Sequence, residues 1–269
     1  MKRRVLKYAS SVNRNLAANP AHNFAKNHTF CIYASNAIYS FIPKNACSTM
    51  RLSIALANGC IASRDDFRWI HYNNNTFNAN LRDLYCADYT FVILRCPYSR
   101  LASTYLDKFV EKTGELWNLY YASNQVFDPD SLSFREFCEL LKMPQYLNLN
   151  EHWKPQSTFL IYEEYDEYFP FEDFKSVQDV LERKIGLDIV DARRLTKHGT
   201  DQYEPDTARR HSDTPAHEIA AMKRKGQCPG PQSLYDADLV KLVWKMYRDD
   251  IDLYASHFGT EALTFSSAL

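Results

Sequence analysis

One short stretch of the sequence, IPKNACSTMR at residues 42–51, constrains the fold more than any other. It follows the apolar run AIYSFI at residues 37–42, which predicts a β-strand, and it leads into a predicted helix that extends to about Asn58. A tight loop of small residues lies between them, and Ser48 and Thr49 open the helix. The order strand, loop, helix predicts a P-loop-like unit of an α/β protein.

The predicted loop has the features of an anion site. A helix N-terminus presents unpaired backbone N–H groups and the positive end of the helix dipole. Lys44 adds a mobile positive charge, and Ser48 and Thr49 add hydroxyl donors. The stretch therefore predicts a site for a phosphate or sulfate group on a nucleotide.

A second predicted strand, YTFVIL at Tyr89–Leu94, ends in a basic residue, Arg95. The carboxyl ends of parallel strands are where open α/β sheets bind ligands. After Pro97 the spacing becomes helical, and this helix carries Ser103. Taken alone, these two side chains are ordinary structural features. Beside the Lys44 loop, a guanidinium fork and a hydroxyl predict a second phosphate site.

Periodicity predicts the remaining elements. Residues 30–33 predict a strand in a hairpin with residues 37–42, and residues 67–71 predict a further short strand. Helical spacing and a capping-box pattern predict helices at residues 99–112, 133–141, 173–185 and 237–254. Strand–loop–helix units of this kind indicate an α/β fold, with a central parallel β-sheet flanked by helices.

The organisation of the chain is predicted from composition. Residues 1–28 are polar and predict an N-terminal extension, residues 29–269 predict a single domain, and residues 190–235 predict a long loop, a possible lid. The net charge of −1 gives no argument for nucleic acid or a membrane surface as a partner. No apolar run reaches the roughly 18–20 residues of a transmembrane helix. Seven dispersed cysteines without a CxxC pair favour a cytoplasmic protein with reduced thiols.

Together, IPKNACSTMR and FVILRCPYSRLASTYLDKF resemble the 5′-phosphosulfate and 3′-phosphate signatures of PAPS-dependent sulfotransferases, where PAPS is 3′-phosphoadenosine 5′-phosphosulfate. The closest group is the carbohydrate sulfotransferases of the chondroitin/dermatan type, sulfotransferase family 2. Their motifs resemble PKxAC[ST]xx[KR] and VRxPxxRLxSAY. Further similar segments follow in order, at residues 133–141, 150–156 (NEHWKPQ) and 246–254 (MYRDDIDLY).

The sequence departs from the eukaryotic members at two motif positions. Cys96 stands where an acidic residue is common, and Met50 where tryptophan is frequent. Those members also carry a membrane anchor and luminal disulfides, neither of which is expected here. The chain is therefore similar to a soluble, bacterial member of the family, and its acceptor stays open.

The resemblance implies transfer of the sulfuryl group from PAPS to a hydroxyl of an acceptor, a carbohydrate by resemblance. It implies in-line displacement with PAP as product and without a metal. Lys44 would act on the leaving group, Ser48 and Thr49 would bind the 5′-phosphate, and Arg95 and Ser103 would hold the 3′-phosphate. The implied donor-binding residues are Lys44, Asn45, Ala46, Cys47, Ser48, Thr49, Arg95 and Ser103.

The acceptor hydroxyl needs a general base, and histidine suits this role near neutral pH. His71 ends the predicted strand at residues 67–71, close to the position of histidine bases in several sulfotransferases, and His152 lies in NEHWKPQ. Glu151 is a carboxylate that can orient or replace the histidine. Both histidines stay candidates, and an ordinary structural role is the alternative for each.

Two other functions stay open. A P-loop kinase or NTPase needs GxxxxGK[ST], with the lysine at the far end of the loop. Here the lysine opens the loop, and no glycine occurs between Ile42 and Asn58. The other alternative is a non-catalytic nucleotide-binding protein of the same fold, and the presence of Lys44, Arg95 and Ser103 counts against it.

Overall fold

The computed structural model describes residues 4–13, 15–196, 199–200 and 202–266. The chain forms two compact units. The first comprises Met1–Arg95 and Gln156–Lys197, and the second comprises Cys96–Pro155 and His198–Leu269. The predicted boundary at residue 28 is not tested by this division and stays a prediction. In the described ranges, no helix combines the length and the apolar character that a bilayer crossing requires.

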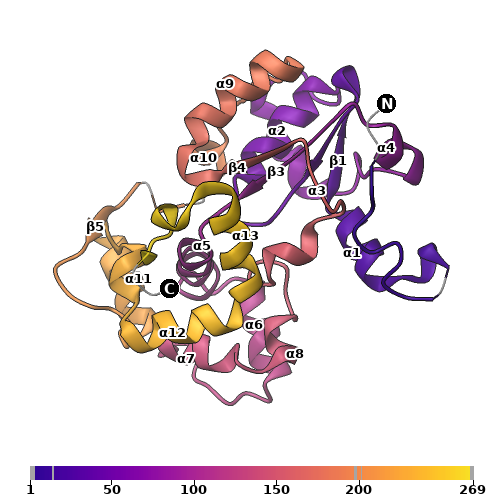
Figure 1. The fold of residues 1–269 in the computed structure, drawn as a ribbon. Coiled ribbons are helices and arrows are strands. Elements are labelled where there is room, and N and C mark those ends of the chain that lie inside the picture. The colour runs from indigo at the N-terminus through magenta and orange to yellow at the C-terminus, as the bar shows by residue number, and fades with distance from the viewer. Residues whose placement is uncertain (1–3, 14, 197–198, 201, 267–269) are drawn as a thin grey trace. The chain divides into compact units, whose positions relative to one another are not determined.

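The first unit contains a four-stranded sheet in the order β1, β2, β3, β4 (Figure 1). The strands are β1 (Thr29–Ile32), β2 (Ala37–Ser40), β3 (Tyr89–Leu94) and β4 (Glu167–Pro170). β1 and β2 form the predicted antiparallel hairpin, whereas β2, β3 and β4 run parallel. The structure confirms the α/β fold with a sheet of parallel strands flanked by helices, and β1 adds an antiparallel edge.

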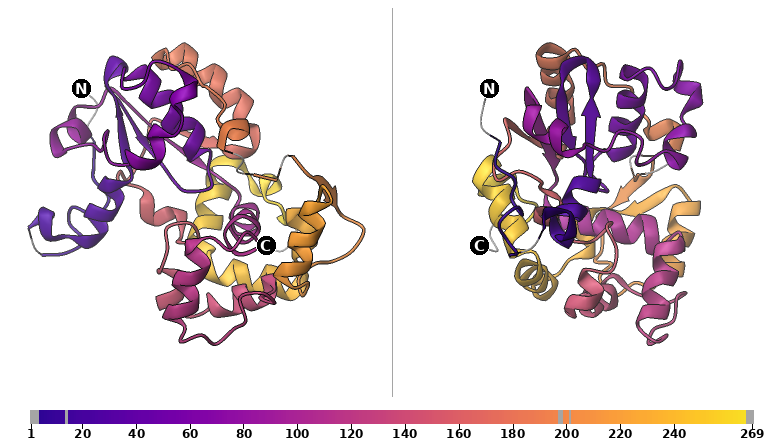
Figure 2. Two further views of the ribbon diagram at one scale, coloured as in Figure 1. Left: turned by 180° about the vertical axis from the view of Figure 1, so that it is seen from behind. Right: turned by 90° about the vertical axis from the view of Figure 1, so that its right-hand side faces the viewer.

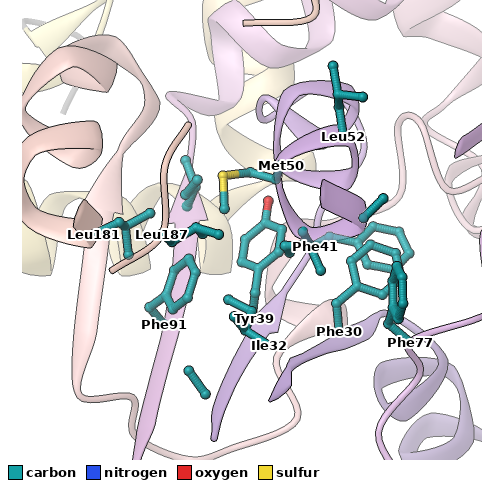
Figure 3. Packing of buried hydrophobic residues seen from close by; sticks show 14 of the residues in the cluster. Phe30, Ile32, Tyr39, Phe41, Met50, Leu52, Phe77, Phe91, Leu181 and Leu187 are labelled. Carbon is teal, nitrogen blue, oxygen red and sulfur yellow. The ribbon is translucent and has the colours of Figure 1, made fainter. Parts of the chain in front are cut away.

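One face of this sheet carries the apolar core of the first unit. Alternate residues of each strand point to this face, as the two-residue period of a strand requires. α2 (Cys47–Ala57) and α9 (Phe174–Ile185) cover it, and α9 ends at Gly186 with a left-handed φ of 64°, as predicted. Figure 3 shows the packed side chains, among them Phe30, Tyr39, Met50, Phe91 and Leu181.

Polar side chains contact the opposite face of the sheet. They come from the start of the chain and from the segment just before β4. Ser40 Oγ lies 2.7 Å from the hydroxyl of Tyr165, and the buried Arg4 donates to Thr90 Oγ1 at 3.1 Å. Arg4 also forms an ion pair with Asp166 at 2.5 Å. Arg4 is thus anchored to the sheet, and η1 (Leu16–Ala18) and α1 (Pro20–Asn27) follow it in the chain.

The second unit is mainly helical (Figure 2). Its α-helices are α5 (Pro97–Thr104), α6 (Gly114–Ala122), α7 (Phe134–Leu140), α8 (Pro144–Leu147), α11 (Ala216–Arg224), α12 (Ala237–Met246) and α13 (Arg248–Phe258). A π-helical turn, η4 (Tyr105–Phe109), continues α5. The predicted capping box before α7 is confirmed, because Ser133 and Glu136 cap it reciprocally. Packed aromatic rings fill the core, including Tyr105, Phe109, Phe137 and Trp153.

Two predicted elements were wrong in type. Residues 67–71 form no strand, because they lead into a helical turn, α3 (Trp69–Tyr72), after η3 (Arg64–Asp66). The segment 190–235 is not one long loop. It contains α10 (Arg193–Thr196), α11 and two short parallel strands, β5 (Glu204–Asp206) and β6 (Gln227–Pro229). The run at residues 67–71 is too short for its period to distinguish a strand from a helix, so periodicity alone does not decide its type.

The predicted helix at residues 237–254 is divided in two. Tyr247, with φ −115° and ψ 29°, ends α12 and precedes α13. Its buried hydroxyl donates to the Trp153 carbonyl oxygen at 2.6 Å. The amphipathic period continues across the break through Val243 and Ile251, both buried. The sequence pattern therefore did not reveal the interruption.

Candidate functional site

The loop between β2 and α2 turns without a glycine. Lys44 and Ala46 both adopt left-handed conformations, with φ of 73° and 59°. In a residue with a Cβ, this conformation costs roughly 1–2 kcal/mol. Such strain persists only where the surrounding structure holds it in place. Neighbouring residues must therefore stabilise this loop conformation, and we treat those residues as part of the site.

The N-terminus of α2 lies at the end of this loop. Ala46 occupies the N-cap position and makes no side-chain hydrogen bond to the first turn. The first-turn N–H groups of a helix need acceptors, and the positive end of the helix dipole lies there. Lys44 and Ser48 are both half-buried beside this end. This local structure has the backbone features that favour an anion, and the binding of an anion there stays a prediction.

Ser48 and Thr49 differ in their surroundings, although the sequence suggested the same role for both. Thr49 is buried, and its Oγ1 accepts a hydrogen bond from the Ala192 N–H at 3.2 Å. One turn later, Ser53 Oγ accepts from the Val190 N–H at 2.9 Å. Thr49 therefore ties α2 to the segment after α9, whereas Ser48 is half-exposed. Binding of a 5′-phosphate by either residue stays a prediction.

Two amide side chains behind the loop, Asn45 and Gln156, form a buried network with backbone groups of β3 and Arg95. Asn45 and Gln156 are 0% and 1% exposed, so their polar atoms depend on protein partners. Asn45 Nδ2 donates to the Ile93 carbonyl oxygen at 2.9 Å and to Gln156 Oε1 at 2.6 Å. Gln156 Nε2 donates to the Arg95 carbonyl oxygen at 2.8 Å, and its Oε1 accepts from the Arg95 N–H at 3.1 Å.

The Arg95 side chain also contacts the loop. Its Nη1 donates to the Lys44 carbonyl oxygen at 2.9 Å, and its guanidinium lies 4.4 Å from the centre of the Phe171 ring. A guanidinium over an aromatic face gains cation–π attraction. The structure thus brings Lys44, Asn45 and Arg95 together at the carboxyl ends of β2 and β3. Binding of a 3′-phosphate by Arg95 stays a prediction.

The second unit carries two of the predicted site residues, Ser103 and His152. Ser103 lies half-buried on α5. His152 Nδ1 lies 2.8 Å from Asn150 Oδ1 and 3.5 Å from Glu115 Oε1. Because these oxygens accept, the favoured neutral tautomer carries its proton on Nδ1 and leaves Nε2 as the basic nitrogen. A histidine oriented in this way has the arrangement of a general base.

Glu115 keeps its negative charge beside His152. Burial alone would raise the pKa of this carboxyl, but the hydrogen bond from Thr113 and the charge of Lys108 outweigh that effect and hold the pKa below its usual value. Lys108 Nζ lies 3.3 Å from Glu115 Oε1 and 3.3 Å from Asp107 Oδ2. Asp107 and Lys108 both belong to the π-helical turn η4.

The backbone around His152 is fixed by α5. Arg100 donates to the carbonyl oxygens of Lys154 at 2.8 Å and Glu151 at 3.0 Å, and Thr104 Oγ1 donates to the His152 carbonyl oxygen at 2.9 Å. The carboxylate that faces the imidazole is Glu115, whereas the sequence suggested Glu151.

His71 lies on α3 of the first unit, exposed and in a helical turn, so its predicted place at the end of a strand is wrong. The sequence reasoning missed three contributors: Glu115, Gln156 and Phe171. Gln156 belongs to the quoted NEHWKPQ segment, which was the one available signal. Nothing in the sequence connects Glu115 with His152, or Phe171 with Arg95.

Comparison with known proteins matches this chain to the sulfotransferase family over residues 27–256. Carbohydrate sulfotransferase 14 of Danio rerio is 28% identical over 134 residues, which cover 44% of this chain and 36% of that relative. The matched region therefore spans about a third of the relative's length. No solved structure gives a significant match.

Proposed function

Because the chain belongs to the sulfotransferase family, we propose that it transfers the sulfuryl group of PAPS to a hydroxyl group of a carbohydrate acceptor. The uncapped start of α2 behind Lys44 carries this proposal, because it offers N–H donors and a cation to an anionic donor. The similarity to a protein named carbohydrate sulfotransferase 14 supports a carbohydrate as the acceptor class.

The chemistry of the loop fits the phosphosulfate end of PAPS. Bound there, PAPS supplies an electrophilic sulfur: the acceptor oxygen forms the new S–O bond, the S–O bond to the phosphate breaks, and PAP leaves with the electron pair. Lys44 stabilises the charge that develops on the departing oxygen, and the N–H groups of Cys47 and Ser48 stabilise the phosphate. Arg95 and Ser103 bind the 3′-phosphate.

A histidine accepts the proton of the acceptor hydroxyl. His152 and His71 are both candidates from the sequence, and the ring contacts of His152 with Asn150 and Glu115 favour His152. The dispersed positions of the seven cysteines, without a CxxC pair, support the cytoplasm as the proposed place of action.

Transfer of label from PAPS to a carbohydrate panel, followed by mass spectrometry of the products, tests the proposed function. Lys44→Ala should lower kcat by about 10²–10³-fold, because a charge aimed at the leaving group acts mainly in the transition state. The matched control is Lys175→Ala, since Lys175 is exposed on α9 of the same unit.

Equal activity of the Lys44→Ala and control variants would overturn the role of Lys44. PAP binding to the wild-type protein without any transfer across the panel would favour the alternative of a non-catalytic nucleotide-binding protein. The other alternative, a P-loop kinase or NTPase, predicts binding of ATP or GTP in place of PAP.

A further inference from the structure

We propose that Gln156 is a positioning residue for the Lys44 loop. Its buried carboxamide, with that of Asn45, holds Lys44 and Ala46 in the left-handed conformations that direct the loop toward the donor. Gln156 is the last residue of the NEHWKPQ segment, far from the loop in sequence. The inference rests on the proposed function, because it takes the loop as the donor site.

Backbone groups fix the orientation of both amides. The Ile93 carbonyl can only accept, so the Asn45 atom facing it at 2.9 Å is the amino group. The same amino group donates to Gln156, which must therefore present its oxygen at 2.6 Å. The Arg95 backbone demands the same orientation, because its N–H donates to that oxygen and its carbonyl accepts from the Gln156 amino group. Each requirement agrees with the others.

Gln156 also replaces a missing strand neighbour. β2 pairs with β3 up to the Ser40–Val92 position, and beyond it the Ile93 carbonyl oxygen accepts from the Asn45 side chain. Two residues further on, the backbone N–H and carbonyl of Arg95 face the same side of β3, and both bond to the Gln156 side chain as they would to an adjacent strand. The carboxamide therefore extends the sheet by one residue and connects that extension to Asn45 in the loop.

Hydrogen bonds that involve Gln156, directly or through Arg95, restrain two consecutive loop residues, Lys44 and Asn45. The Asn45 side chain bonds to Gln156, and the Lys44 carbonyl accepts from the guanidinium of Arg95, whose own backbone Gln156 holds. A loop without glycine needs such supports to keep two left-handed residues. The backbone conformation of Lys44 sets the direction of its Cα–Cβ bond, so the network sets the direction in which this flexible side chain leaves the loop.

Gln156→Glu tests this role with almost no change of shape. A carboxylate offers acceptors only, so one oxygen would face the Arg95 carbonyl oxygen in place of the present 2.8 Å hydrogen bond. We expect faster amide hydrogen exchange at residues 44–49, with exchange inside β2 and β3 unchanged. PAP should bind about tenfold more weakly. Gln178→Glu is the matched control, because Gln178 lies on α9 of the same unit and is half-exposed.

The outcomes separate this inference from the proposed function. If loop exchange and PAP affinity equal those of the control variant while only Tm falls, Gln156 is merely structural and the inference fails. If loop exchange accelerates but the wild-type protein itself does not bind PAP, the support of the loop stands and the proposed donor is wrong. If Gln156→Glu does not fold, Gln156→Ala, which buries no charge, provides the same comparison.

Discussion

At the residue scale, the two candidate histidines differ in what surrounds their rings. His152 has its Nδ1 close to two acceptor oxygens, and its backbone is braced by Thr104. His71 lies exposed on a single helical turn. A base must be held at a fixed distance from the hydroxyl that it deprotonates. The surroundings of His152 provide that restraint.

We therefore predict that His152→Ala lowers kcat by about 10²–10⁴-fold, the usual contribution of a general base. PAP affinity should stay within a factor of two. A histidine base acts in its neutral form, so kcat of the wild type should rise with pH as imidazole loses its proton, and the variant should lose this dependence. Initial rates across pH, with His217→Ala as an exposed control, provide the measurement.

If the pH dependence of kcat depended on His71 and not on His152, His71 would be the base. In that case His71→Ala would remove the pH dependence, and His152→Ala would behave like the His217→Ala control. A loss of PAP binding in His152→Ala would indicate a role in the donor site instead.

The sequence could predict the residues that belong to local patterns, such as Lys44 before a strand–helix junction. It could not predict the contacts that depend on distant parts of the chain. Gln156 and Asn45 are 111 residues apart, and Glu115 reaches His152, which lies in a turn, from α6. No periodicity or spacing encodes such contacts, because the fold alone brings these side chains together.

At the element scale, the N-cap of α7 allows a direct test of local stability. Ser133 Oγ accepts from the Glu136 N–H at 3.2 Å, and the Glu136 carboxylate accepts from the Ser133 N–H at 2.8 Å. Ser133→Ala should destabilise the protein by about 1 kcal/mol, the usual value for an N-cap. Urea unfolding followed by circular dichroism measures this change.

Ser256→Ala is the matched control, because Ser256 is exposed in the last turn of α13 and bonds only to the Leu253 carbonyl among the contacts described. This variant should change the unfolding free energy by less than about 0.5 kcal/mol. If Ser133→Ala were equally neutral, the cap would contribute nothing to stability.

Elements with strong patterns were predicted well, and elements decided by tertiary packing were not. β3 is a six-residue run of apolar and β-branched residues, buried from Thr90 onward, and α9 has both a clear apolar face and a stop at Gly186. In contrast, Trp69–Tyr72 is too short for its period to choose between strand and helix. The break at Tyr247 depends on a hydroxyl contact with Trp153, which lies elsewhere in the sequence.

At the scale of the whole molecule, the donor class can be tested through stability. A ligand that binds only the folded protein stabilises it by about 2.7 kcal/mol at a hundred times its Kd. We expect PAP to raise Tm by several degrees, and ATP and GTP at equal concentration to raise it much less. Adenosine 5′-monophosphate serves as a control for the contribution of the 3′-phosphate. A larger shift with ATP or GTP would favour the kinase or NTPase alternative.

The route of the chain through the sheet has a consequence for biosynthesis. β3 and β4 pair directly, yet the residues of Cys96–Pro155 are made between them. On the ribosome, β1, β2 and β3 can associate early, whereas β4 and Gln156 emerge only after that insertion. Closing so long an intervening segment is slow compared with forming local contacts. The nascent Lys44 loop therefore stays without its amide support until Gln156 has emerged.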